Sequence, residues 1–461
     1  MQLFSLSYLF FFLPTTALVY YLVPRAYKVF VLFVASLYFY ALLPSMLIGP
    51  QNWRVLPLNL IIMVACVITD YLLARPVFLY GKGSWQGRVA LYAAAIKNIL
   101  LFIILSSFGQ LGVMIAPVGI AVYTFTSLGY LIDLYNGEAD LVTSFYDYGV
   151  FCCFFGKIFV GPVVSCNDFL VQLRRPSFSL TKIGNGFVWL LHGLAKKVIL
   201  ADGALLLASQ LSAIPYDDKT VLSMWMLLTC YIFATYFTLS GYSDLARGSG
   251  ALLGLDLPEN FHYPLQAQSV TDFFSRFNIS AYRYVRKYVY GALGAEDNGK
   301  LATTLNIILI TILMGLWYGI SVNFLVWGAS LGLIITLETL YGENVLHRIP
   351  AFFRRLYTFI CIVISFVWFS TSRLGQSWFY LLTLFGLPRP QHNLFAPELF
   401  DNYSLYLLSS NWLLLLLCAF FCTSLVNTTS RRFMRNHPAL ADALSTVSNL
   451  LLFVLVLAFL V

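Results

Sequence analysis

Long stretches without a charged side chain dominate this sequence and limit what it can fold into. The longest, Leu301–Leu337, contains 37 consecutive residues without Asp, Glu, Lys or Arg. A helix needs roughly 20 mostly apolar residues to cross the hydrocarbon core of a bilayer. The other uncharged runs are Met1–Pro24, Val29–Trp53, Val55–Thr69, Asn98–Ile132, Thr220–Ser243, Leu356–Ser372, Leu374–Pro388, Asn402–Ser430 and Ala443–Val461. These runs predict a chain that folds in lipid.

Composition argues against the other classes of protein. Apolar residues make up 60% of the chain and charged residues 10%, against about 45–50% and about 25% in soluble globular proteins. A disordered chain would need low hydrophobicity, and alternation of period two over ten-residue segments, typical of a transmembrane β-barrel, is absent. We expect an all-α polytopic membrane protein with roughly 11 to 13 transmembrane helices and re-entrant segments around a central cavity. One membrane-embedded domain covering residues 1–461 is expected.

The basic residues indicate an orientation and a partner. Under the positive-inside rule the basic loops face the cytoplasm, which places the N-terminus outside. These loops contain Arg25 and Lys28; Arg75, Lys82 and Arg88; Arg276, Arg283, Arg286 and Lys287; and Arg431, Arg432 and Arg435. The net charge of +8 is dispersed among them without a nucleic-acid motif, so the lipid bilayer is the expected partner and nucleic acid is not. The eight cysteines lack zinc-type spacing, and no metal site is expected.

Charge concentrates in one segment. Residues 241–300 hold 12 of the 48 charged side chains, so this segment must form a cytosolic or interfacial surface or line a water-filled cavity. Within it, Asp244 follows a 24-residue uncharged span and is the strongest intramembrane ionisable candidate. Such residues mark functional sites in membrane proteins. The alternative is a structural partner for Arg247.

Residues Thr271–Tyr290 have the periodicity of an amphipathic helix. At 100° per residue, an aromatic face lies beside a basic stripe. The aromatic face contains Phe273, Phe277, Tyr284 and Tyr288, and the stripe contains Arg276, Arg283 and Lys287. Such a helix can insert its aromatic face at the headgroup boundary, either as a membrane-surface helix without catalytic duty or as a binding site for an anionic cytosolic donor.

The 37-residue run is too long for one crossing. At 1.5 Å per residue it would span about 55 Å as a helix, so we expect a turn or break near Gly319–Asn323. Trp317, Tyr318, Asn323 and Trp327 would then cluster near the break, either at a site or as an interfacial aromatic belt. Gly and Pro inside other apolar runs also predict broken or re-entrant helix. They are Pro117, Gly119, Gly161 and Pro162.

Six sequence blocks resemble one family, in the family's order. The blocks are PVGIAVYTFTSLGYLIDLY (Pro117–Tyr135), VGPVV (Val160–Val164), GLAKKVILAD (Gly193–Asp202), the segment Gly241–Ser280, GLWYG (Gly315–Gly319) and WFSTSR (Trp368–Arg373). The chain resembles the bacterial branch of the membrane-bound O-acyltransferases, which includes alginate and peptidoglycan O-acetylation proteins and the teichoic-acid D-alanylation protein. The resemblance covers most of the chain.

The resemblance implies a function. Members of the family transfer an acyl group from a cytosolic thioester, carried by coenzyme A or an acyl-carrier protein, to a hydroxyl. They do so directly or through an extracytoplasmic acyltransferase partner. The expected activity is therefore transfer of an acyl group, first of all acetyl, toward a cell-surface polysaccharide or a partner. No bound cofactor is expected, and the expected location is a bacterial inner or plasma membrane.

The chain departs from the family at two positions. The family's catalytic histidine, in its tryptophan-histidine-glycine motif, corresponds to Tyr318, and a second family histidine corresponds to Asn278. A histidine with a pKa near 6.5 suits general-base catalysis, whereas tyrosine near 10 and an amide do not. Tyr318 can still donate a hydrogen bond to a thioester carbonyl, and Asn278 can orient one. His262, in the loop between Pro258 and Pro264, is a candidate to replace the missing histidines.

Two hypotheses follow. The first is a polysaccharide-modifying O-acyltransferase whose catalytic chemistry is rearranged. The second is a catalytically degenerate relative that keeps the scaffold as a binding, assembly or regulatory partner. A secondary transporter is disfavoured because paired inverted halves are not evident.

Overall fold

The protein is described by a computed structural model that covers residues 5–48, 55–110, 119–291, 299–342, 346–388 and 396–460. All regular elements in these ranges are helical, and the sole β-bridge joins Phe261 to Phe277. Nine helices in the same ranges are long and apolar enough to cross a membrane. The prediction of an all-α polytopic membrane protein is confirmed.

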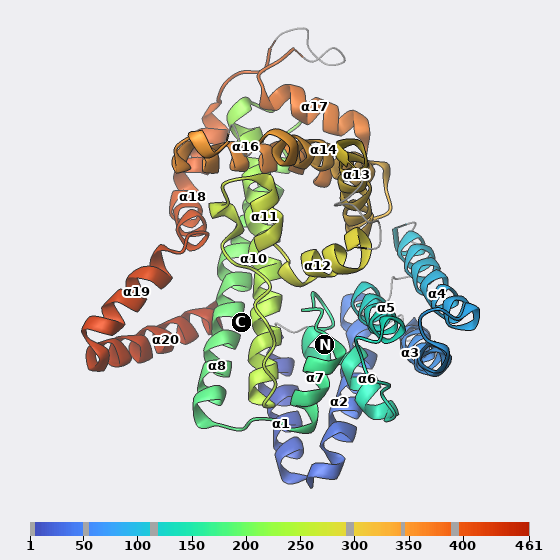
Figure 1. Cartoon of the computed structure of the whole chain (residues 1–461). Coiled ribbons are helices and arrows are strands. Elements are labelled where there is room, and N and C mark those ends of the chain that lie inside the picture. The colour runs from blue at the N-terminus through green and yellow to red at the C-terminus, as the bar shows by residue number, and fades with distance from the viewer. Residues whose placement is uncertain are drawn as a thin grey trace. The chain divides into compact units, whose positions relative to one another are not determined.

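The residues fall into two compact units that are interleaved along the chain (Figure 1). The first unit comprises Met1–Gly193 and Tyr242–Glu259, and the second comprises Leu194–Gly241 and Asn260–Phe459. The expectation of one domain stays a prediction.

The first unit contains eight α-helices before the chain enters the second unit. They are α1 (Leu13–Leu22), α2 (Lys28–Ile48), α3 (Val55–Tyr80), α4 (Trp85–Gln110), α5 (Ile120–Asn136), α6 (Phe145–Cys153), α7 (Cys166–Arg174) and α8 (Leu180–Ala195). A buried carboxylate joins α3 to α4, since Lys97 Nζ lies 2.8 Å from Asp70 Oδ1 and Asn98 Nδ2 donates to both Asp70 oxygens at 3.1 Å. Polar groups at membrane depth require such partners.

The second unit contains the later helices, and α10 runs from it into the first unit. They are α9 (Asp202–Ser212), α10 (Val221–Leu252), α11 (Val270–Arg276), α12 (Ile279–Tyr284), the π-helical turn η7 (Val285–Tyr290), α13 (Gly299–Tyr318), α14 (Val322–Leu337), the π-helical turn η9 (Glu338–Gly342), α16 (Ala351–Phe369), α17 (Leu374–Leu384), α18 (Asn402–Phe421), α19 (Leu425–Asn436) and α20 (Pro438–Leu460).

The long uncharged run breaks where its length predicts. Helix α13 ends at Tyr318 and α14 begins at Val322, with the Ser321 hydroxyl accepting the N–H of Phe324 at the start of α14. Glycines let the two helices approach closely. A Cβ at Gly328 would lie 2.4 Å from Thr311 O, and one at Gly332 would lie 2.4 Å from Thr311 Oγ1. This small-xxx-small pattern is a common way to pack membrane helices.

The other predicted interruptions differ from place to place. Gly119 begins α5 with a left-handed φ of 76°, whereas Pro117 lies outside the described residues. Gly161 and Pro162 lie in the non-helical segment before α7. The run Leu374–Pro388 forms α17, whose 11 residues are too few to cross a bilayer.

Candidate functional site

Asn278 interrupts the amphipathic segment, which corrects the expectation of one helix over Thr271–Tyr290. Helix α11 ends at Arg276, and Asn278 adopts the left-handed conformation, with φ 54° and ψ 58°, before α12 begins. Asparagine tolerates this conformation better than most residues other than glycine.

A neighbouring loop holds the break in place. The fully buried Asn260 accepts the Ile279 N–H on its carbonyl oxygen at 2.9 Å and the Ser280 N–H on its side-chain oxygen at 2.8 Å. Its amide nitrogen donates to Asn278 Oδ1 at 2.9 Å. Asn260 therefore satisfies the backbone that the interrupted helix leaves open, and it leaves the Asn278 NH₂ group available to donate.

The aromatic face of this segment packs inside the protein. Phe273, Phe277 and Tyr284 are buried, so they do not enter the headgroup region as predicted. The Phe261 and Phe277 rings meet edge to face with centroids 5.1 Å apart. Packing against the loop through Phe261 explains the difference, because helical periodicity alone does not show which neighbour covers an apolar face.

Glu338 fixes the other end of α11. Its carboxylate accepts the Val270 N–H at 2.7 Å, the Thr271 N–H at 2.8 Å and the Thr271 hydroxyl at 2.7 Å. The side chain is buried at the end of α14, within a membrane-spanning helix. A carboxylate at a helix N-terminus satisfies unpaired N–H groups and interacts favourably with the helix dipole.

Tyr318 is the last residue of α13 and lies close to Asn278, although the two are forty residues apart in the sequence. Its ring packs edge to face against Trp327 and Phe369, each with centroids 5.5 Å away. The Asn278 side chain lies close to the Tyr318 hydroxyl. Because Asn278 Oδ1 already accepts from Asn260, its NH₂ group is the part of the amide that can donate toward the tyrosine oxygen.

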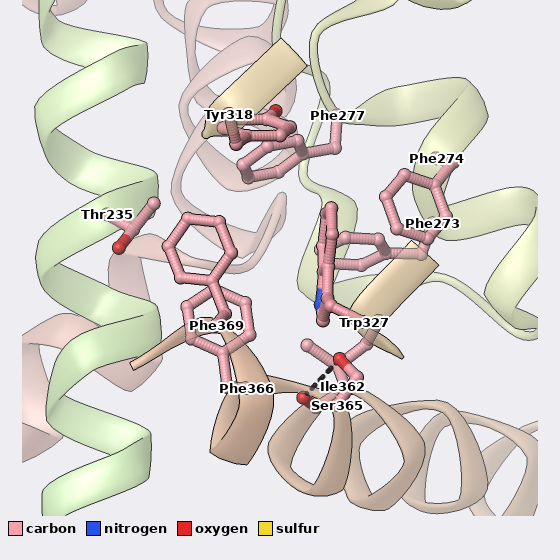
Figure 2. Close-up of a pocket in the computed structure, with 10 residues that line it drawn as sticks. All are labelled: Thr235, Phe273, Phe274, Phe277, Tyr318, Trp327, Ile362, Ser365, Phe366 and Phe369. Atoms are coloured by element: carbon pink, nitrogen blue, oxygen red, sulfur yellow. Dashed lines mark hydrogen bonds between the residues drawn. The ribbon is translucent and has the colours of Figure 1, made fainter. Parts of the chain in front are cut away.

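The Tyr318 ring lines a narrow apolar cavity (Figure 2). Its volume is about 10 Å³, roughly the space for one water molecule. The lining residues are Thr235, Phe273, Phe274, Phe277, Tyr318, Trp327, Ile362, Ser365, Phe366 and Phe369. No histidine, carboxylate or amine is among them. The indole N–H of Trp327 has no hydrogen-bond partner in the described ranges. The lining therefore offers hydrogen-bond donors and no general base.

Asn323 holds helices together and does not face this cavity. Its amide nitrogen donates to Thr371 O at 2.8 Å, Thr371 Oγ1 at 2.9 Å and Ser377 Oγ at 3.0 Å. The side chain thereby ties α14 to the start of α17. The structure gives Asn323 a structural role, and the WFSTSR block supplies one of its partners.

The remaining predicted residues lie outside the cavity lining. The His262 side chain is exposed, although its N–H pairs with Arg276 O at 3.0 Å. Arg276 Nε lies 2.7 Å from Asp272 Oδ1, and Trp317 is partly buried. Arg283 and Lys287 are exposed. Asp244 belongs to the first unit, 3.9 Å from Arg247.

Sequence reasoning missed Asn260, Glu338 and Phe369. Glu338 had a usable signal, because it is the first charged residue after the 37-residue uncharged run, and isolated membrane carboxylates need partners. Asn260 and Phe369 lie inside blocks that carry the family resemblance or next to one, and nothing in their local pattern separates them from ordinary loop and core residues.

Removing the Glu338 carboxylate should destabilise α11. Glu338→Ala leaves two buried N–H groups unpaired and should lower the free energy of unfolding by about 2 kcal/mol or more, since a helix cap and hydrogen bonds to a charged group are lost. Glu338→Gln keeps one acceptor oxygen and should lose less. Thermal unfolding of the purified full chain in detergent measures both. Equal melting temperatures for the Ala variant and the natural chain would contradict this role.

Comparison with known proteins places the chain among acyl-transferring relatives. Residues 137–381, more than half of the chain, match the model of the membrane-bound O-acyltransferase family. A probable alginate O-acetylase from Pseudomonas syringae pv. tomato is 31% identical over 385 residues, covering 80% of this chain and 72% of the relative. A Helicobacter pylori peptidoglycan O-acetyltransferase is 26% identical over 433 residues, covering 82% and 79%.

A third relative matches a shorter segment. A Bacillus subtilis teichoic acid D-alanyltransferase is 25% identical over 145 residues, covering 30% of this chain and 36% of the relative. Asn278 and the residues that line the narrow cavity, Tyr318 among them, all fall within the family match.

Proposed function

The chain belongs to the membrane-bound O-acyltransferase family, and from that premise we propose that it transfers an acyl group, acetyl first of all, from a cytosolic thioester. The acceptor is a hydroxyl of a cell-surface polysaccharide or an extracytoplasmic acyltransferase partner that passes the group on. The donor is acyl-coenzyme A or an acylated carrier protein. Nine apolar helices among the described residues, together with the bacterial relatives, make the chain a multi-pass bacterial membrane protein.

The meeting of Asn278 and Tyr318 is the observation that carries this proposal. The two side chains come from separate elements, α13 and the α11–α12 break, and lie close together, with the Tyr318 ring lining an apolar cavity. By the sequence resemblance, their positions correspond to those of the family's two histidines. Two polar side chains brought together at these positions support action on a thioester carbonyl.

The donors on these side chains define their role in the reaction. The acceptor oxygen attacks the carbonyl carbon, the new C–O bond forms as the C–S bond breaks, and the carbonyl oxygen carries negative charge in between. The Tyr318 O–H stabilises that charge by donating to the oxygen, and the Asn278 N–H orients the tyrosine. Such donors act strongly because the surrounding apolar rings exclude water. The acceptor proton leaves with the sulfur as the thiol.

A second function, a degenerate scaffold that binds or assembles partners, is favoured by one observation. The residues that line the narrow cavity include no general base. A positioned acid or base typically contributes about 10²–10⁴ to the rate. Without a general base, the site assists the reaction only by stabilising the negative charge on the carbonyl oxygen.

Donor turnover separates the two functions. The full chain in nanodiscs is given radiolabelled acetyl-coenzyme A, or an acylated carrier protein, with alginate or peptidoglycan fragments as acceptors, and release of free thiol and label transfer are measured. The natural chain should turn over at least one donor. The enzymatic proposal would be overturned in favour of the scaffold if the natural chain turned over no donor while the double variant Asn278→His and Tyr318→His did.

A further inference from the structure

A second and larger cavity shares a wall with the narrow one. It measures about 280 Å³ and is bounded by α11, α12, η7, α13, α14 and η9, all within the second unit. Phe274 and Trp327 line both cavities. Most of the lining is aliphatic or aromatic, including Ile310, Met314 and Leu331. The space is therefore suited to an apolar group.

The size of this cavity exceeds what a short acyl group needs. By the measure that gives the narrow cavity room for about one water molecule, a cavity of about 280 Å³ has room for many such groups. The relatives are named for acetyl and D-alanyl groups, which have two and three carbons. The cavity matches an aliphatic chain better than it matches the acyl group that the proposed reaction transfers.

The charged side chain in the lining indicates which chemical group the other end of such a ligand carries. Arg286 is the charged residue among the lining side chains and is exposed at its other side. Arg283 and Lys287, also exposed, add positive charge beside it. A guanidinium group binds phosphate in a bidentate manner, and basic residues near a membrane surface attract anionic headgroups.

The position of the cavity favours a membrane source for the chain. Helices α13 and α14, which line it, are both long and apolar enough to cross a membrane. Tyr282 and Tyr290 line the side that also carries Arg286, and tyrosines gather where a membrane meets water. An aliphatic chain along the helices with its phosphate at the tyrosine-rich side reproduces the orientation of a phospholipid.

We propose that this cavity binds one acyl chain of an anionic phospholipid, whose phosphate is held by Arg286. This inference goes beyond the proposed acyl transfer and does not depend on it. Bound lipid would contact the Trp327 side chain, which also packs against Tyr318.

Lipid retention by the purified full chain tests the proposal. Native mass spectrometry in detergent is used to count phosphatidylglycerol bound per chain, with phosphatidylcholine as the neutral comparison. Ile310→Trp fills the cavity, and Leu313→Trp, on an exposed position of the same helix, is its matched control. Arg286→Gln removes the phosphate ligand, and Arg355→Gln, at an exposed position of α16, removes a charge that does not line the cavity.

The natural chain should retain one phosphatidylglycerol and little phosphatidylcholine. Ile310→Trp and Arg286→Gln should each weaken retention by about tenfold or more, while both controls retain the lipid. Melting temperatures identify a variant that fails to fold. If Ile310→Trp does not fold, Arg286→Gln, at an exposed position, provides the test.

Three outcomes overturn the proposal. The first is equal retention by the two tryptophan variants. The second is equal retention of phosphatidylcholine and phosphatidylglycerol, since the phosphate at Arg286 would then contribute no selectivity. The third is stoichiometric displacement of phosphatidylglycerol by decanoyl-coenzyme A, which would assign the cavity to a thioester donor with a medium-length chain.

Discussion

Replacing Tyr318 by phenylalanine should lower acyl transfer by about 10²–10³-fold, the loss measured when one oxyanion donor is removed. Phenylalanine keeps the ring that packs against Trp327 and Phe369 and removes only the O–H. The donor to the carbonyl oxygen is lost. Because the donor acts on charge that develops in the transition state, the loss should fall on kcat more than on KM.

The measurement uses the donor assay in nanodiscs, with initial rates over a range of donor concentrations. Tyr406→Phe, at an exposed position of α18, is the matched control and should leave the rate unchanged. Melting temperatures of Tyr318→Phe and the natural chain should agree within a few degrees. A Tyr318→Phe variant as fast as the natural chain would remove the tyrosine hydroxyl from the reaction.

Adding a single methyl group at Gly328 should destabilise the α13–α14 hairpin. The new Cβ would lie 2.4 Å from Thr311 O and 2.7 Å from Ile312 Cα, and both neighbours are backbone atoms that cannot rotate away. Forcing the helices apart would open the packing of two membrane spans and displace Tyr318 from Trp327. We expect Gly328→Ala to lower the free energy of unfolding by about 1–3 kcal/mol, as overpacking of a close-packed interior does.

Thermal unfolding and the monodisperse yield on size exclusion measure this effect. Gly375→Ala is the matched control, because a Cβ at that position of α17 meets nothing within 4 Å. Alanine there should be neutral or slightly stabilising, since it favours the helix over glycine. Equal losses at Gly328 and Gly375 would indicate a general intolerance of helical glycine replacement and would contradict the close approach at Gly328.

The preference of the chain for lipid over water was predictable from the sequence, because it depends on the summed hydrophobicity of side chains that are neighbours along the chain. Uncharged runs locate membrane helices without any knowledge of their partners. The break between Tyr318 and Val322 was also predictable, since a run of 37 residues exceeds the thickness of the bilayer. The resemblance pointed to positions 278 and 318 through sequence order alone.

The break at Asn278 was not predictable from periodicity, because it depends on a partner 18 residues away. The pattern of Phe273, Phe277 and Tyr284 is equally compatible with a continuous helix, and Asn260 decides against it by accepting the N–H groups of Ile279 and Ser280. Likewise, Asn323 looked like a site residue until its three hydrogen bonds to Thr371 and Ser377 were known. An amide side chain has the same chemistry whether it binds a substrate or a neighbouring helix, so the residue type alone does not distinguish the two roles.

The sequence therefore established that this protein folds in lipid, that it is helical and which family it belongs to, since each follows from residues read in order. The folded chain established that Asn278 lies close to Tyr318, that Glu338 holds α11 in place and that Trp327 lines two cavities. These facts rest on contacts between residues tens of positions apart. Such contacts form only when apolar faces and polar groups find partners across the fold, and local patterns do not name the partner.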